Sequence, residues 1–201
     1  MSRAAAIPLV LLVCLAGPGV AHPGAYGGGG EDRPARRWLA EGGISLPLSF
    51  SLGSYDVGGG AGLGVEFPQS DVHSFVVRAG FDHMNETRYE FGSDNSGSAD
   101  IGTLRAGVRF QRRREGWRSE YSEAAFGGGY ERLSTRVTDG LTGASRLDEV
   151  RGGGWLFAVG FGISARTEAP LGFFLDTHLF YLFANHATNQ FATFRLGFSL
   201  Q

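Results

Sequence analysis

The sequence predicts an all-β chain that forms an eight-stranded antiparallel up-and-down transmembrane β-barrel. Segments in which apolar and polar residues alternate with a period of two recur along the chain, and the last of them, Ala192–Gln201, alternates almost to its final residue. The 201 residues include 33 Gly and 16 Phe, a composition that suits short strands better than a helical bundle. The connections between the segments also differ in length in a regular way, as they do in barrels with short turns at one end and longer loops at the other.

The N-terminal residues have the pattern of a secretory signal peptide. Arg3 supplies a positive charge, Ile7–Ala16 forms an apolar run, and Gly19–Ala21 provides small residues for cleavage. The apolar run is shorter than the roughly 18 residues that a transmembrane helix needs. The only cysteine, Cys14, falls inside this segment, so we expect no thiol or disulfide in the mature chain. The expected organisation is a signal peptide (residues 1–21), a flexible Gly- and Pro-rich periplasmic tether (22–37) and an outer-membrane β-barrel (38–201).

The first four predicted strands each place apolar residues on one face. In a bilayer that face contacts acyl chains, and the opposite face lines the barrel lumen. The segments, each with its predicted outward residues, are Trp38–Phe50 (Ala40, Gly42, Ile44, Leu46, Leu48, Phe50), Val57–Phe67 (Ala61, Leu63, Val65, Phe67), Ser74–His83 (Phe75, Val77, Ala79, Phe81) and Ile101–Gln111 (Leu104, Ala106, Val108, Phe110).

The remaining four predicted strands follow the same rule with one weak member. The segments are Ser119–Tyr130 (Ala124, Phe126, Tyr130 outward), Gly154–Arg166 (Trp155, Phe157, Val159, Phe161, Ile163), Leu171–Ala184 (Phe173, Leu175, Thr177, Leu179, Tyr181, Phe183) and the closing segment (Ala192, Phe194, Leu196, Phe198, Leu200). Leu171–Ala184 is the weakest match, because Phe174, Phe180 and Leu182 lie on its polar side.

The connections and the aromatic residues predict the orientation of the barrel. Met84–Asp100 and Glu131–Gly153 are long enough to be extracellular loops, whereas Pro68–His73 and Arg112–Arg118 suit periplasmic turns. An even number of strands then places both termini in the periplasm. Aromatic residues gather near the strand ends, as expected for rings at the two membrane interfaces. The predicted girdles are Trp38, Phe67, Phe110, Trp117 and Phe198 at one end, and Phe50, Phe81, Tyr130, Trp155, Tyr181, Phe183 and Phe191 at the other.

The inner face is predicted to carry a network of charges rather than an open channel. Eight strands enclose a space that side chains can fill, and buried charges persist only when they are paired. The predicted lumen charge network consists of Arg78, Asp82, Arg105, Arg109, Glu123, Asp176 and Arg195, with Glu41 and Glu66 on the same face. Because Arg105 and Arg109 lie across a short turn from Glu123, we expect these three to cluster, and Arg105→Ala to leave Glu123 unpaired.

The stretch from Trp38 to Gln201 resembles the family of eight-stranded outer-membrane β-barrel domains, which includes the transmembrane domain of outer-membrane protein A. The resemblance rests on the sequences of residues 63–68, 104–110 and 126–130 and on the ending Phe194-Arg195-Leu196-Gly197-Phe198. It implies an outer-membrane location, contact with outer-membrane lipids and lipopolysaccharide, and insertion by the barrel-assembly machinery. Members commonly end in an aromatic residue, whereas this chain ends in Gln201.

One short element suggests an enzyme instead. His186-Ala187-Thr188-Asn189 is similar to the His-x-Ser-Asn element of the lipid A deacylases, in which a histidine activates a serine nucleophile. Here Thr188 takes the place of that serine, and residues 191–201 contain no Asp or Glu to serve as the acidic partner. Asp176 and His178 share one strand face and form a second candidate acid–base pair.

Three hypotheses about function follow. The first is a non-enzymatic integral outer-membrane protein with a structural or surface-recognition role, whose extracellular partner is unknown. The second is a lipid A-modifying hydrolase. The third is a soluble lipocalin-like binder that uses Phe174, Phe180 and Leu182 as an apolar pocket. The five histidines show no metal-ligand spacing, no cofactor motif is present, and the near-balanced charge (18 basic against 20 acidic residues) predicts no nucleic-acid partner.

Overall fold

The computed structural model of this chain describes residues 36–50, 55–70, 72–90, 93–113, 118–139, 141–166, 170–184 and 187–200. The predicted signal peptide, most of the predicted tether, Trp117 and His186 lie outside these ranges. Within them, no helix is long and apolar enough to cross a membrane.

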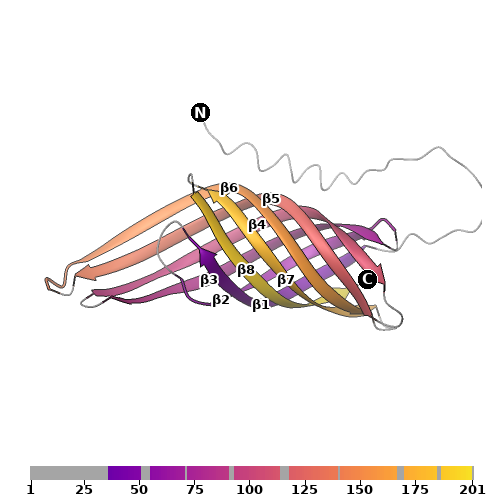
Figure 1. Ribbon diagram of the computed structural model, residues 1–201, viewed down its shortest axis with the longest axis horizontal. Helices are drawn as coiled ribbons and strands as arrows, with labels where there is room; N and C mark the ends of the chain where they lie inside the picture. Colours follow the sequence, from indigo (N-terminus) through magenta and orange to yellow (C-terminus); the bar gives the residue numbers. More distant parts are fainter. Residues whose placement is uncertain are drawn as a thin grey trace, which may run out of the picture. The chain divides into compact units, whose positions relative to one another are not determined.

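The described chain is one closed antiparallel barrel of eight strands (Figure 1). Each strand pairs with the next along the chain, and pairing of the first strand with the last closes the sheet. This confirms the predicted fold class. The strands are β1 (Arg37–Ser49), β2 (Gly58–Pro68), β3 (His73–Glu90), β4 (Ser93–Arg113), β5 (Arg118–Asp139), β6 (Ser145–Arg166), β7 (Leu171–Ala184) and β8 (Ala187–Leu200).

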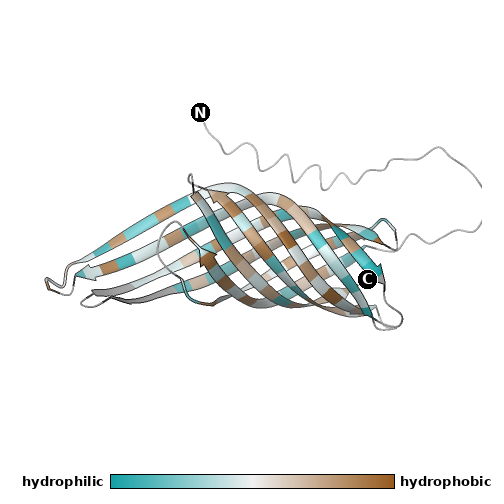
Figure 2. Cartoon of the chain, viewed as in Figure 1, coloured by the Kyte–Doolittle hydropathy of each residue, from teal (hydrophilic) through white to brown (hydrophobic). Residues whose placement is uncertain are grey.

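Alternation along the strands sorts the side chains as predicted. Successive side chains of a strand point to opposite faces, so a closed sheet has one set outside and one set enclosed. Large apolar residues on the outer face, such as Leu63, Phe161 and Phe194, are exposed, whereas Arg78, Arg105 and Arg109 are almost completely buried. In Figure 2, apolar residues recur along the barrel part of the strands.

The two predicted long loops are instead continuations of strands. Met84–Asp100 belongs mostly to β3 and β4, which stay paired out to Glu90 and Ser93. Glu131–Gly153 belongs mostly to β5 and β6, which stay paired out to Thr138 and Ser145. Because β4 also pairs with β5 along this whole length, β3–β6 form a four-stranded sheet that runs past the ends of the other strands (Figure 1). We call this part the β3–β6 extension.

Two residues predicted for the outer aromatic girdle face inward. The pairing of β1 with β8 shifts by one residue between Pro47 and Ser49, and such an irregularity reverses which face the following side chains occupy. Phe50 consequently packs against the enclosed apolar core, with its ring centroid 5.1 Å from that of Tyr55. Phe191 is fully buried, as the alternation of β8 around the outward Ala192 requires. The predictions for these two residues were therefore wrong.

Candidate functional site: the lumen and its ion network

The barrel interior is occupied by side chains arranged in layers. At the end where β1 begins and β8 ends, Leu39, Val76 and Phe174 pack together. Charged side chains fill the middle of the lumen. Toward the β3–β6 extension lies a larger apolar layer, whose buried members include Met84, Ile101, Leu133, Leu156, Phe180, Leu182 and Phe191.

Arg78 of β3 is the centre of the ion network. Its guanidinium contacts three carboxylates from three other strands: Glu41 of β1, Glu123 of β5 at 3.2 Å and Asp176 of β7 at 3.1 Å. All four side chains are at least nine-tenths buried. Because an unpaired charge in a medium of low dielectric constant is costly, these contacts tie four strands to one another.

Arg109 of β4 extends the network toward the end of the barrel where β1 begins and β2 ends. Its Nη2 lies 2.9 Å from Oε2 of Glu123, and its Nη1 lies 3.4 Å from Oε2 of Glu66. Gln111 donates a 2.9 Å hydrogen bond to the other oxygen of Glu66. The Arg109 guanidinium also lies over the ring of Tyr121, 4.0 Å from its centroid, which adds a cation–π contact.

Arg105 does not join the cluster expected for it. The ion pairs of Glu123 are with Arg78 and Arg109, whereas the nearest carboxylate partner of Arg105 is Glu41, at 3.8 Å. Its guanidinium stacks over the ring of Phe180 at 4.8 Å. Arg105→Ala therefore leaves Glu123 with two cationic partners, which corrects the expectation drawn from the sequence.

Arg195 and Asp82 form a separate pair nearer the β3–β6 extension. Arg195 of β8 contacts Asp82 of β3, and Ser45 of β1 donates a hydrogen bond to the same carboxylate. A side chain at Gly60 would collide with both partners, since its Cβ would lie 2.7 Å from Arg195 Nη2 and closer still to Asp82 Oδ1. The absence of a side chain at Gly60 is what lets a long arginine cross the lumen here.

Several interior partners were not included in the predicted network. Tyr121 donates a 2.9 Å hydrogen bond to Asp176, and His178 lies 3.4 Å from Glu123 and 3.5 Å from Asp176. Both face inward by the same alternation that places Glu123 and Asp176 inside, so their positions followed from the pattern. Their contacts did not, because these depend on how the strands are staggered around the barrel.

The residues proposed for a lipocalin-like pocket are packed into the interior. The rings of Phe180 and Phe191 stack at 4.6 Å, and Leu182 belongs to the same apolar cluster. Phe174 lies under the Arg78 guanidinium at 5.5 Å. Toward the β3–β6 extension, Asn189 donates a hydrogen bond to Glu131, and both residues are fully buried.

The two candidate catalytic elements lie in different surroundings. His186 is outside the described residues, and Thr188 and Asn189 lie within β8 and point to opposite faces of the barrel wall. Asp176 and His178 are enclosed among the charges described above. Among the described residues, no group of three or more His, Cys, Asp or Glu side chains is arranged to hold a metal ion.

A second set of charges forms a row on the outer face, directly beyond Phe81, Tyr130 and Trp155. His83 Nδ1 lies 2.6 Å from Asp100, and the hydrogen bond to this carboxylate raises the pKa of His83 above its usual 6.5. On the neighbouring strands, Arg132 and Arg151 both donate to Glu149 and lower the pKa of that carboxyl. We call these five residues the outer charged row.

Comparison with solved structures supports the fold. The chain is similar to Neisserial surface protein A (13% identity over 82% of this chain and 96% of that one, TM-score 0.56). It is also similar to a major outer membrane protein of Thermus thermophilus (15%, 83% and 99%, TM-score 0.55). A third is the attachment invasion locus protein Ail of Yersinia pestis, in complex with the heparin analogue sucrose octasulfate (16%, 82% and 97%, TM-score 0.51). No protein-family model and no curated protein sequence matches this chain. At these identities the likeness establishes a shared barrel fold.

Proposed function

We propose that this chain is a non-enzymatic integral outer-membrane protein that presents the β3–β6 extension at the cell surface for recognition of an extracellular partner. In this proposal the barrel crosses the bilayer and both termini lie in the periplasm. The described side chains of its lumen are buried and packed against one another, so the proposal places its function on its outer surfaces.

The observation that carries the proposal is the band of exposed apolar side chains around the barrel wall. On β6 this face runs from Trp155 (58% exposed) to Ile163 (50% exposed). At about 3.3 Å per residue and a tilt near 40°, this stretch covers roughly 20 Å along the barrel axis, close to the apolar band of outer-membrane barrels. In water such a band would be an aggregation hazard, whereas acyl chains are its natural solvent. A lipocalin-like barrel has the opposite arrangement.

The β3–β6 extension supports a recognition role. Beyond Tyr130, β5 continues for about 30 Å of strand, past the outer charged row to Asp139. The surface of its β5–β6 hairpin combines arginines such as Arg136 and Arg146 with the fully exposed Leu141. Connecting segments that a rigid scaffold holds in place commonly carry binding residues. The Yersinia neighbour was solved with a heparin analogue bound, so a barrel of this fold can hold a ligand.

The proposal is tested by labelling cysteine variants on intact bacteria with a membrane-impermeant maleimide. Leu141→Cys at the hairpin tip should react on intact cells, whereas Gln69→Cys in the β2–β3 connection should react only after the outer membrane is permeabilised. Heat-modifiable migration on a gel should accompany both variants, because a folded barrel resists detergent until it is boiled. The reverse labelling pattern, or extraction of the protein without detergent, contradicts the proposal.

A further inference from the structure

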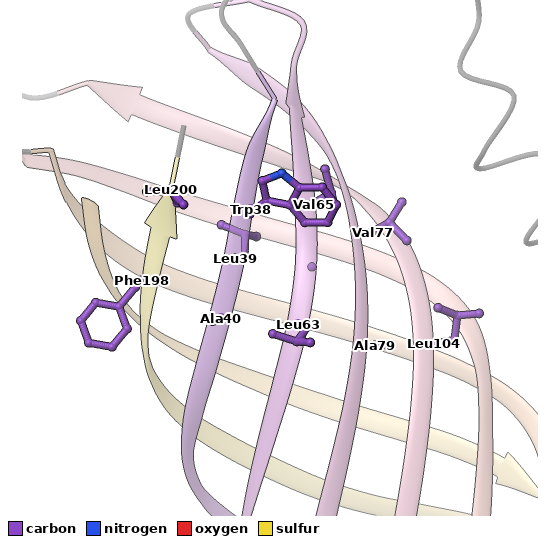
Figure 3. Close-up of a pocket in the computed structure, with 11 residues that line it drawn as sticks. Trp38, Leu39, Ala40, Leu63, Val65, Val77, Ala79, Leu104, Phe198 and Leu200 are labelled. Atoms are coloured by element: carbon purple, nitrogen blue, oxygen red, sulfur yellow. The ribbon is translucent and has the colours of Figure 1, made fainter. Parts of the chain in front are cut away.

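The outer wall of the barrel carries an apolar groove of about 430 Å³ (Figure 3). It lies over β1, β2, β3 and β4 and reaches the end of β8, and all of its lining residues are apolar. Trp38 and Val65, which are register partners on β1 and β2, lie side by side at one end of it. Phe198 and Leu200 of β8 form one wall, and Leu104 of β4 lies at the other side. Its volume lies within the range of about 300–1,000 Å³ typical of small-molecule sites.

The sequence makes this groove by placing small residues between large ones. Leu63 pairs with Ala40 on one side and with Ala79 on the other, so two methyl groups flank it on the outer face. On β1 and β2 the next outward positions toward the extension are also small, because Gly42 pairs with Ala61. Elsewhere on the wall, the outer face carries rings such as Phe126 and Trp155, which stack at 5.4 Å.

We propose that this groove holds one acyl chain of an anionic phospholipid from the periplasmic leaflet. This inference rests on the proposed function, which places the band in a membrane with the start of β1 and the end of β8 on the periplasmic side. The groove lies at that end, and the periplasmic leaflet consists of phospholipid, whereas lipopolysaccharide occupies the opposite one. The occupant of a wholly apolar groove at this depth must itself be apolar.

The chain around the start of β1 matches a phospholipid from headgroup to acyl chain. Arg36 directly precedes β1 and is exposed, and Trp38 and Ala40 follow it on the outer face. The Arg36 guanidinium binds the lipid phosphate, and the Trp38 indole suits the interfacial region of the membrane. The small side chain of Ala40 leaves room for the acyl chain. A second copy of this protein is a less suitable occupant, since two convex walls cannot fill each other's grooves without reciprocal protruding side chains.

The experiment uses tryptophan fluorescence in vesicles of phosphatidylcholine that contain an increasing fraction of brominated phosphatidylglycerol, whose bromines quench nearby indoles. One variant, Trp117→Phe with Trp155→Phe, reports from Trp38 alone. A reference, Trp38→Phe with Trp117→Phe, reports from Trp155 at the other end of the band. We expect Trp38 to reach half-maximal quenching at a roughly fivefold lower fraction of brominated lipid than Trp155, the size of effect that one basic side chain has at an anionic surface.

Three further variants, made in the background that keeps Trp38, separate the possible outcomes. Ala40→Leu should fill the groove and bring Trp38 quenching to the level of Trp155, whereas the matched control Ala124→Leu, on the exposed face of β5, should change nothing. Arg36→Gln should remove the preference for phosphatidylglycerol. Equal quenching of the two tryptophans, unaffected by Ala40→Leu, overturns the groove site but leaves membrane residence intact. Absence of quenching at both positions contradicts the proposed function itself, and disulfide-linked dimers of Leu63→Cys identify a second copy as the occupant and overturn the lipid proposal.

Discussion

Arg78 is the residue on which most of the interior electrostatics depend. Its guanidinium forms ion pairs with Glu41, Glu123 and Asp176, and all of these side chains are buried. Removing the shared cation leaves carboxylates with too few partners in a medium that solvates them poorly. Breaking a buried ion pair typically costs about 3–5 kcal/mol.

We therefore predict that Arg78→Met lowers the free energy of unfolding by about 3–5 kcal/mol, measured by urea titration of the barrel in phospholipid vesicles. The matched control is Arg132→Gln, which removes an arginine from an ion pair on the outer surface and should lower the free energy of unfolding far less, because water solvates both partners. Equal losses for the two variants would show that the interior pairs are no more important than surface ones.

His83 provides a pH-dependent contact at the edge of the apolar band. Because its hydrogen bond to Asp100 raises its pKa above the usual 6.5, the folded protein favours the charged imidazole. The stabilisation is then fully present below about pH 6.5 and is lost as the pH rises through the higher pKa of the folded state. An NMR titration of the imidazole should give a midpoint above 6.5, and Asp100→Asn should lower it. A midpoint unchanged by Asp100→Asn would exclude this carboxylate as the cause.

At the scale of strands, the sequence pattern predicts a strand wherever one face of that strand contacts apolar surroundings and the other does not. The eight barrel segments were predicted because alternation of apolar and polar residues marks a wall with two different environments. Ser93–Ala99 and Arg132–Val150 carry polar residues on both faces, so a pattern read from hydropathy does not distinguish them from loops. They form strands because register propagates outward from the paired barrel segments. The inward orientation of Phe50 was not predicted for a related reason. The bulge that turns its side chain inward leaves no signal in the amino-acid composition.

The outer part of the β5–β6 hairpin should be dispensable for folding. Thr135 pairs with Asp148, so residues 136–147 can be replaced by an Asn-Gly turn without disturbing the register below. The shortened chain keeps every described ion pair of the lumen. We expect it to retain heat-modifiable migration and to change the free energy of unfolding by less than the loss predicted for Arg78→Met. If the shortened chain fails to fold, the extension is part of the folding unit rather than an addition to it.

At the scale of the whole molecule, the sequence pattern predicts which charged residues face the lumen. It does not predict which of these residues form ion pairs with one another. Alternation placed all seven predicted charged residues inside. Which carboxylate meets which arginine depends on the stagger of strands that are not neighbours in the sheet. Arg78 and Asp176, for example, are 98 residues apart and lie on β3 and β7. A single sequence carries no local signal for such a pair, and for this reason Arg105 was assigned to the wrong carboxylate.

The two kinds of interior layer close the lumen by different physical means. The ion network fills it with paired side chains that hold one another in place, and the apolar side chains of Phe180, Leu182 and Phe191 oppose the passage of ions because they offer no ligands to replace the water around an ion. We therefore predict no discrete conductance steps from the purified protein in planar lipid bilayers at high salt. Phe191→Ala, which thins the apolar layer, should also give none, because the ion network beneath it is intact. Regular steps from the unmodified protein would show that the charged layer rearranges to admit ions, and steps from Phe191→Ala alone would show that the apolar layer is the only barrier.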